Sequence, residues 1–173
     1  GNLTMAGGYN VTIDVTGGTT AAADELRSIL ENTAGTVTAD GLTDISGEAD
    51  DLTAVQNEGS FSHDGDDYTV TIADADGDLT VTEINAIAGL TGGVVTAVAI
   101  STDIADYDGT NATLTTLSTD KIAITINNTP VDAAKLVVLD NKTATIINAT
   151  AVEDFSGAAD EVAAIVSSEG VSL

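Results

Sequence analysis

The sequence Asp44-Ile45-Ser46-Gly47 indicates how the chain folds, because it recurs. Asp154-Phe155-Ser156-Gly157 repeats the whole pattern, and Asp103-Ile104-Ala105 repeats its beginning. Each copy follows a run rich in threonine and β-branched residues and precedes a short apolar pattern with helical spacing. Such recurrence predicts a tandem array of similar structural units, and arrays of this kind are usually scaffolds.

Two sets of landmarks are almost evenly spaced along the chain. Val11, Val70 and Ile124 each begin a run in which apolar residues alternate with threonine, a pattern that predicts half-buried strands. These three residues are separated by 59 and 54 positions, and the aspartates of the recurring motif are separated by 59 and 51. We therefore expect three repeats of about 50 residues, each made of two β-α half-units of about 25.

The expected organisation is a lead-in over 1–8, followed by repeats over 9–67, 68–120 and 121–173, with an acidic insertion at 57–67. We expect the Asp-Ile-Ser-Gly motif to form a turn, and Thr19 or Thr20 to cap the first helix. Period-two patterns predict strands within 9–15, 36–42, 68–72, 94–100, 122–126 and 145–147. Helical spacing predicts helices over 22–30, 49–55, 84–90, 114–117, 136–139 and 162–165.

Strands and helices in series predict an α/β fold of repeating β-α-β-α units with a mostly parallel sheet. Two architectures fit this pattern. One is a solenoid-like array with the helices on one face of the sheet, and the other is a compact layered domain that closes the same elements around one core. The alternating threonines predict a sheet with one solvent face, which favours the solenoid.

The composition excludes several classes of function. Acidic residues number 28 and basic residues four, so the net charge is -24, which repels nucleic acid and anionic membrane surfaces. Cysteine is absent, which excludes disulfides, thiolate metal sites and cysteine nucleophiles. No apolar run reaches the roughly 18 residues of a membrane span. A mean hydropathy of +0.20 and the repeated apolar pattern argue for a folded chain.

The sharpest candidate for chemistry is an acidic stretch that resembles a calcium loop of the EF-hand or dockerin type. Asp74, Asp76 and Asp78 occupy its first, third and fifth positions, between a predicted strand and a predicted helix. Leu79 replaces the turn glycine and Asn85 the bidentate glutamate, for which Glu83 would substitute only in a shorter loop. The alternative is a tight acidic turn with a helix cap.

Two further groups of carboxylates each have two interpretations, either as a calcium site or as carboxylates that bind no ion. Asp64, Asp66 and Asp67 lie together in the insertion, where they form either a cation site between repeats or a solvated loop. The recurring aspartates of the motif form either a ladder of carboxylates with cations between them or separate caps of their own turns. We prefer the caps, because Asp commonly accepts hydrogen bonds from nearby backbone N–H groups.

No set of residues indicates an enzyme. His63 is the sole histidine and stands in a polar loop, so we expect it at the surface without a zinc or triad role. Paired glycines lack the lysine of a phosphate loop and the spacing of a dinucleotide-binding motif. We therefore expect no catalytic and no cofactor-binding residues.

The chain resembles the low-complexity α/β repeats of very large secreted proteins of marine bacteria and cyanobacteria, among them RTX-like adhesins and S-layer-like surface proteins. The recurring motif carries the resemblance, together with Ala-Asp-Asp-Leu-Thr-Ala-Val at 49–55 and Ala-Asp-Glu-Val-Ala-Ala-Ile at 159–165. The glycine-rich RTX nonapeptide is absent, so the resemblance does not extend to a calcium β-roll. It implies an extracellular, calcium-rich setting and a spacer, adhesive or lattice role.

The leading hypothesis is a non-enzymatic structural or adhesive repeat segment of a large extracellular or cell-surface protein, stabilised by calcium. Its expected partners are neighbouring repeats of the same long chain, with no nucleic acid and no membrane insertion. Two alternatives stay open: a module that recognises a glycan or another surface protein, and a self-assembling subunit of a surface layer or filament.

Overall fold

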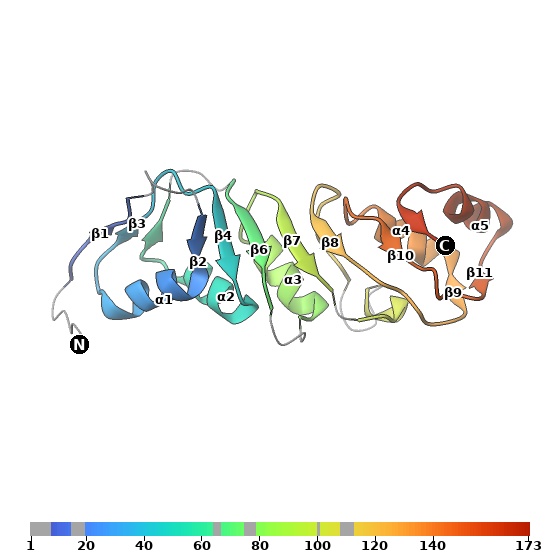
Figure 1. Ribbon diagram of the computed structural model, residues 1–173, viewed down its shortest axis with the longest axis horizontal. Helices are drawn as coiled ribbons and strands as arrows, with labels where there is room; N and C mark the ends of the chain where they lie inside the picture. The colour runs from blue at the N-terminus through green and yellow to red at the C-terminus, as the bar shows by residue number, and fades with distance from the viewer. Residues whose placement is uncertain (1–7, 15–19, 64–66, 75–78, 100, 108–112) are drawn as a thin grey trace. The chain divides into compact units, whose positions relative to one another are not determined.

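The computed structural model describes residues 8–14, 20–63, 67–74, 79–99, 101–107 and 113–173. The chain divides into two compact units. The N-terminal unit comprises Gly1–Ala75 and Leu90–Val94, and the C-terminal unit comprises Asp76–Gly89 and Val95–Leu173. Short strands and helices alternate along both (Figure 1), and the paired strands of each unit are parallel. The predicted α/β class with mostly parallel sheets is confirmed.

The N-terminal unit contains two stacks of parallel strands. One stack consists of β1 (Val11–Thr12), β3 (Val37–Thr38) and β5 (Phe61–Ser62), with Val11, Val37 and Phe61 in register. The other consists of β2 (Thr20–Ala22), β4 (Asp44–Gly47) and β6 (Thr69–Ile72), with Thr20, Asp44 and Thr69 in register. Residues in register are 24 to 26 positions apart, close to the length of one expected half-unit.

Two helices cover this unit, α1 (Ala23–Asn32) and α2 (Ala49–Asn57). Each begins with a buried alanine and buries two larger residues at helical spacing, so small and branched side chains form a thin core. Ile45 of the central strand β4 is fully buried against this layer, because its neighbours on β2 and β6 point the same way in register. The helix residues of the core are Ala23, Leu26, Leu30, Ala49, Leu52 and Val55.

The C-terminal unit repeats the same kind of pairing. β7 (Val95–Val98) pairs with β8 (Lys121–Ala123), β9 (Val131–Asp132) with β11 (Phe155–Ser156), and β10 (Ile147–Asn148) with β12 (Val171–Ser172). The partners in these three pairs are 24 or 25 positions apart. The helical elements are α3 (Val81–Ala88), the 3-10 helix η1 (Ile104–Asp106), α4 (Ala133–Asp140) and α5 (Ala159–Val166).

The recurring motif is not the turn that the sequence predicts. Asp44–Gly47 is strand β4, and the third copy includes strand β11. The second copy lacks the glycine and instead forms η1, whose last residue Asp106 stands at the glycine position. The predicted cap of the first helix is also wrong, because Thr20 belongs to β2 and the capping position is Ala22, which makes no side-chain cap.

The solenoid of three repeats is not confirmed. The described strands are two to four residues long and fall into separate sheets, so they do not form the one continuous sheet that the array would have. The division into three repeats stays a prediction, and residues 1–7 of the lead-in lie outside the described part. Within the described ranges, no helix combines the length and apolarity needed to cross a membrane.

Candidate functional site

The structure places two residues of the predicted calcium loop and leaves the other two outside its described part. Asp74 follows β6 and is half-buried. Glu83 belongs to the first turn of α3, where its carboxylate accepts hydrogen bonds from Thr80 N (2.8 Å) and Thr80 Oγ1 (2.7 Å). Thr80 in turn accepts a bond from Glu83 N, which completes a capping box. Asp76 and Asp78 lie outside the described residues.

The second predicted cluster is described only in part. Asp67 is exposed just before β6, whereas Asp64 and Asp66 lie outside the described residues. Within the part of the chain that the structure describes, no three His, Asp or Glu side chains are grouped closely enough to hold a metal ion. The calcium sites therefore stay a prediction.

The recurring aspartates have different partners in the three copies. Asp103 Oδ1 accepts a hydrogen bond from Ala105 N at 2.9 Å, which is the predicted cap of its own turn. Asp44 Oδ1 accepts one from Thr69 Oγ1 at 2.7 Å, across the pair formed by β4 and β6. Asp154 is exposed, and its backbone N–H donates to Thr129 Oγ1. The capping interpretation thus describes the second copy, while Asp44 links two strands.

A Thr or Ser residue with the same hydrogen-bonding role follows each of four helices. No pattern described above predicts it. Thr33, Thr91, Thr143 and Ser168 each accept a hydrogen bond from the backbone N–H two positions later. The three threonines also donate to a backbone carbonyl 23 or 24 positions earlier, on Tyr9, Tyr68 and Asp120. Each hydroxyl therefore ties the turn after a helix to the preceding half-unit. The available signal was a Thr or Ser two positions before a glycine in Thr33-Ala34-Gly35, Thr91-Gly92-Gly93 and Ser168-Glu169-Gly170.

His63 is not simply a surface side chain. It is half-buried between two aromatic rings, with ring centroids 5.6 Å from Phe61 and 4.5 Å from Tyr68. Tyr68 is buried, and its hydroxyl accepts a hydrogen bond from Gln56 Nε2 at 2.9 Å. Gln56 Oε1 is buried without a hydrogen-bond partner. This group packs three of the few large rings of the chain together.

One carboxylate of the C-terminal unit is deeply buried. Asp120 is 2% exposed, and its two oxygens accept hydrogen bonds from Val95 N (2.8 Å) and Leu117 N (2.7 Å). Backbone donors on two separate segments thus compensate the loss of hydration. Both oxygens are engaged by the protein itself, so Asp120 is a structural residue rather than a ligand.

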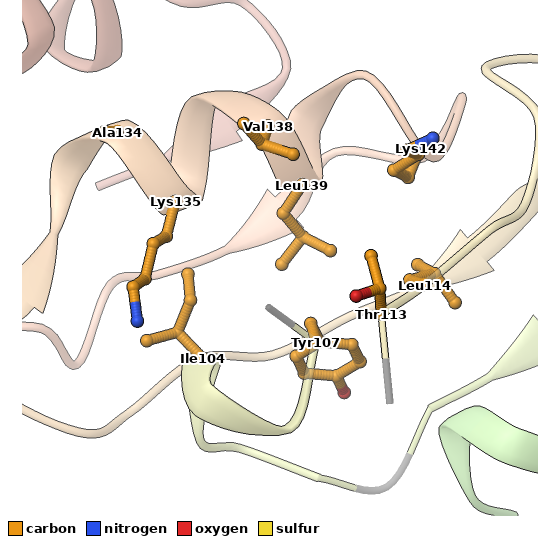
Figure 2. Close-up of a pocket in the computed structure, with 9 residues that line it drawn as sticks. All are labelled: Ile104, Tyr107, Thr113, Leu114, Ala134, Lys135, Val138, Leu139 and Lys142. Atoms are coloured by element: carbon orange, nitrogen blue, oxygen red, sulfur yellow. The ribbon is translucent and has the colours of Figure 1, made fainter. Parts of the chain in front are cut away.

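The C-terminal unit also has a pocket of about 230 Å³ between η1, the 113–114 segment and α4. Figure 2 shows Leu139 in the middle of the group, Ile104 and Tyr107 on the side of η1, and Lys135 and Lys142 toward opposite ends. The Tyr107 ring is 4% exposed, and its hydroxyl donates to Ser101 O at 2.6 Å. Burial, with a smaller effect of Asp106, raises the pKa of the Tyr107 phenol, which therefore stays neutral at ordinary pH.

The pocket was not foreseen from the sequence, because its walls come from segments about 30 residues apart. Among the described residues, those that line it are Ile104, Tyr107, Thr113, Leu114, Ala134, Lys135, Val138, Leu139 and Lys142. Comparisons of the chain with protein-family models, with curated proteins and with solved structures give no match in any of the three.

Proposed function

We propose that the chain is a non-enzymatic structural segment of a large extracellular or cell-surface protein, built from tandem β-α units. The observation that carries the proposal is the uniform spacing of parallel partners, 24 to 26 positions in every strand pair of the two units described above. Half-units of this kind repeat the same type of contact between neighbours along the chain.

The hydroxyl turns support the same proposal. Thr33, Thr91 and Thr143 make equivalent bonds to the preceding half-unit at equivalent places. A repeated bond of this type sets the spacing between successive units locally. Such a segment resists extension along the array, as a spacer or adhesin stalk in the class of RTX-like and S-layer-like proteins requires.

Calcium is the proposed stabilising ion. A net charge of -24 on 173 residues produces strong self-repulsion, which cations between carboxylates would reduce. Oxygen ligands from Asp and Glu suit Ca²⁺, and extracellular modules bind it at about 0.1 to 1 mM. The residues proposed to contribute are those of the two acidic stretches, Asp64, Asp66, Asp67, Asp74, Asp76 and Asp78. Glu83 is left out of this set because its carboxylate caps α3.

The test is thermal unfolding with calcium titrated from zero to about 10 mM, against magnesium at matched ionic strength. We expect a calcium-selective rise in the midpoint, reduced when Asp76 and Asp78 are both changed to Asn. Changing Asp154, which is exposed and far along the chain from both stretches, to Asn is the matched control. An equal response to both ions would show that screening alone stabilises the chain. The proposal of calcium as a specific stabilising ion would then be wrong.

The proposed partners are neighbouring units of the same long chain. Light scattering during the calcium titration separates this role from self-assembly into a layer or filament. A spacer stays monomeric as calcium rises, whereas a self-assembling subunit increases in mass. Binding of the isolated chain on a glycan array, abolished by substitutions within 57–67, would instead favour a recognition module.

A further inference from the structure

We propose that β11 and α5 form a docking surface for the strand at residues 9–13 of a second copy of the chain. The surface repeats one that the N-terminal unit already covers. Residues 154–166 follow the pattern of residues 44–56, so that counterparts are 110 positions apart. In both stretches Asp, an apolar residue, Ser and Gly are followed two positions later by a helix that begins with Ala-Asp. The inference rests on the proposed arrangement of β-α units in tandem.

In the N-terminal unit, strand β6 completes this surface. It pairs in parallel with all four residues of β4, and Val70 lies opposite Ile45. Tyr68, just before β6, is 5% exposed, and its hydroxyl accepts a hydrogen bond from Gln56 Nε2 of α2 at 2.9 Å. The occupant of the surface is therefore a strand that alternates tyrosine, valine and isoleucine with polar residues.

In the C-terminal unit the counterpart surface is more exposed. Among the described residues β11 pairs with β9 alone, whereas β4 has a strand on each side. Ala159 is exposed, although its counterpart Ala49 is only 3% exposed. Phe155 is half-buried, whereas its counterpart Ile45 is fully buried. Val166, in the last turn of α5, is 66% exposed. The exposed residues are apolar and lie where a strand equivalent to β6 would pack.

The chain carries a second strand of the type that fits. Residues 9–13, Tyr-Asn-Val-Thr-Ile, match residues 68–72, Tyr-Thr-Val-Thr-Ile, at four of five positions. The two strands also have the same contact with the half-unit that follows them, because Tyr9 O and Tyr68 O each accept a hydrogen bond from a threonine hydroxyl. They differ in exposure, since Tyr9 is 52% and Tyr68 5% exposed. Residues 9–13 thus resemble β6 without the half-unit that precedes it.

The backbone of residues 9–13 is oriented for the same pairing. Val11 N and Ile13 N both donate to β3 at 2.8 Å. Because the backbone groups of successive residues point to opposite edges of a strand, the N–H groups of Asn10 and Thr12 point to the edge away from β3. Thr69 N, the counterpart of Asn10 N, donates to the chain at the start of β4 at 2.9 Å. A docked strand would present the same N–H groups to β11.

Two separate copies repel each other, because each has a net charge of -24. Joining them in one chain offsets this repulsion by holding the strand at an effective concentration of about 1 mM. Phe155 lies 18 positions before Leu173, so a direct fusion places Val11 of the second copy 29 positions after it. The corresponding partners in β4 and β6 are 25 positions apart. The junction is therefore long enough for the same connection.

The experiment compares this tandem fusion with the single chain by urea unfolding at 0.15 M salt. We expect a higher midpoint for the fusion, because the docked strand buries apolar surface of both copies. Labelling only the second copy with ¹⁵N allows its amide exchange to be followed. Exchange at Asn10 and Thr12 of that copy should be at least about tenfold slower than in the single chain.

The substitution A159E separates docking from general stability. In the first copy it should return the midpoint to that of the single chain, because the glutamate would lie under the docked strand. The same substitution in the second copy is the matched control, since the surface of that copy stays uncovered. Y9S should act in the reverse way, with an effect in the second copy and none in the first. The single chain with A159E should unfold like the parent, which shows that the variant folds.

Equal midpoints for the fusion and the single chain would overturn the proposal. Equal effects of A159E in the two copies would also overturn it, because the substitution would then act within one copy. The calcium response of the single chain does not depend on docking. Failure of docking therefore leaves the calcium test of the proposed function intact, and failure of the calcium test leaves docking intact.

Discussion

Gly47, the last residue of β4, lies against Ala23, the first residue of α1. A Cβ atom on Gly47 would lie 2.6 Å from the Cβ of Ala23, closer than two carbon atoms can approach. Gly157 of the third copy has the equivalent neighbour, Ala133 at the start of α4, and a Cβ atom on Gly157 would lie 3.5 Å from the Cβ of Ala133. Gly157 also has a φ of 134°, which favours glycine. The glycine of the recurring motif therefore allows a strand to pass beneath the start of a helix.

Changing Gly47 to Ala should destabilise the chain by about 1–3 kcal/mol, the usual cost of overpacking a core. The neighbouring atoms are the Cβ and backbone of Ala23, which is fully buried and cannot move aside easily. The midpoint of urea unfolding measures the effect. Gly59→Ala is the control, because a methyl group there meets no atom within 4 Å. Equal losses in the two variants would contradict the packing explanation.

The sequence predicts only part of this fold. The α/β class and the mostly parallel pairing follow from the Val-Thr alternation and from the recurrence of similar segments, both of which can be read from the sequence alone. Asp44–Gly47 is a strand rather than a turn because it pairs with β2 and β6, whose partner residues lie 24 and 25 positions away in the sequence. In the second copy Asp106 replaces the glycine, and the segment forms a 3-10 helix.

The predicted helix at 114–117 failed for a similar reason. Thr115 N donates to Asn85 Oδ1 at 2.8 Å, and Leu117 N donates to Asp120 Oδ2 at 2.7 Å. These two backbone N–H groups donate to side chains outside the predicted helix, so they do not form hydrogen bonds within a helical turn. The apolar spacing of Leu114 and Leu117 is real, but only Leu114 is buried. The walls of the pocket beside α4 likewise come from segments that are distant in the sequence. No local pattern of residues therefore predicts it.

Changing Thr143 to Val should also destabilise the chain. Thr143 Oγ1 accepts hydrogen bonds from Ile122 N (2.9 Å) and Thr145 N (3.0 Å), and Thr143 is only 6% exposed. Valine has nearly the same shape but leaves these donors without an acceptor, at about 1–3 kcal/mol for a buried group. Thr150→Val is the control, because Thr150 is exposed and its hydroxyl donates to Asn148 Oδ1, two residues earlier. Chemical unfolding with equal midpoints for both variants would contradict this role of the hydroxyl turn.

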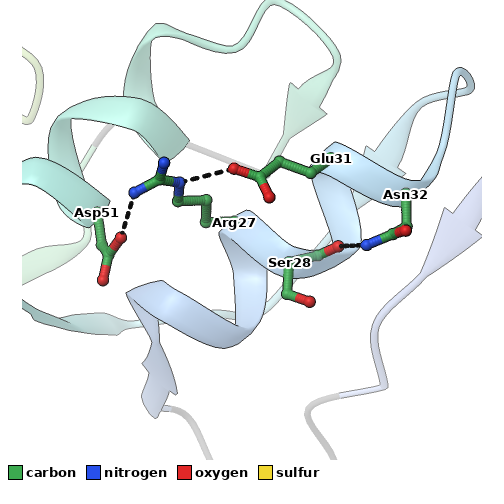
Figure 3. Close-up of polar contacts among 5 residues, drawn as sticks. All are labelled: Arg27, Ser28, Glu31, Asn32 and Asp51. Carbon is green, nitrogen blue, oxygen red and sulfur yellow. Dashed lines mark hydrogen bonds and ion pairs between the residues drawn. The ribbon is translucent and has the colours of Figure 1, made fainter. Parts of the chain in front are cut away.

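The contact between α1 and α2 includes one basic residue, Arg27. Its Nη1 lies 2.7 Å from Asp51 Oδ1 on α2, and its Nε lies 2.8 Å from Glu31 Oε1 on its own helix (Figure 3). The Asp51 hydrogen bond, then the Glu31 bond, raises the pKa of Arg27, so the guanidinium stays charged throughout the accessible pH range.

Changing Arg27 to Gln should lower the melting temperature slightly at low salt and hardly at all in 1 M salt. The side chain is 43% exposed, so water and ions screen both pairs. Melting curves of R27Q and of the parent chain at two salt concentrations measure the difference. K121Q is the control, because it removes the same charge from an exposed strand residue. A loss that is independent of salt would show that Arg27 acts through packing of its stem.

Tyr107 predicts how the stability of the chain depends on alkaline pH. An exposed tyrosine has a pKa of about 10, and burial, with a smaller contribution from Asp106, raises the pKa of Tyr107 above it. The folded state therefore holds this proton more tightly than the unfolded state. Its contribution to stability is complete below about pH 10 and is lost as the pH rises through the folded pKa.

Y107F should accordingly show a weaker fall in unfolding free energy above about pH 10 than the parent chain, although it is less stable at neutral pH because the bond to Ser101 O is lost. The absorbance of tyrosinate identifies the ionising residue. In the parent chain Tyr107 should ionise only as the chain unfolds. Y9F, which removes an exposed phenol, is the control variant. If Y107F and the parent lose stability in parallel above that pH, another group controls alkaline unfolding.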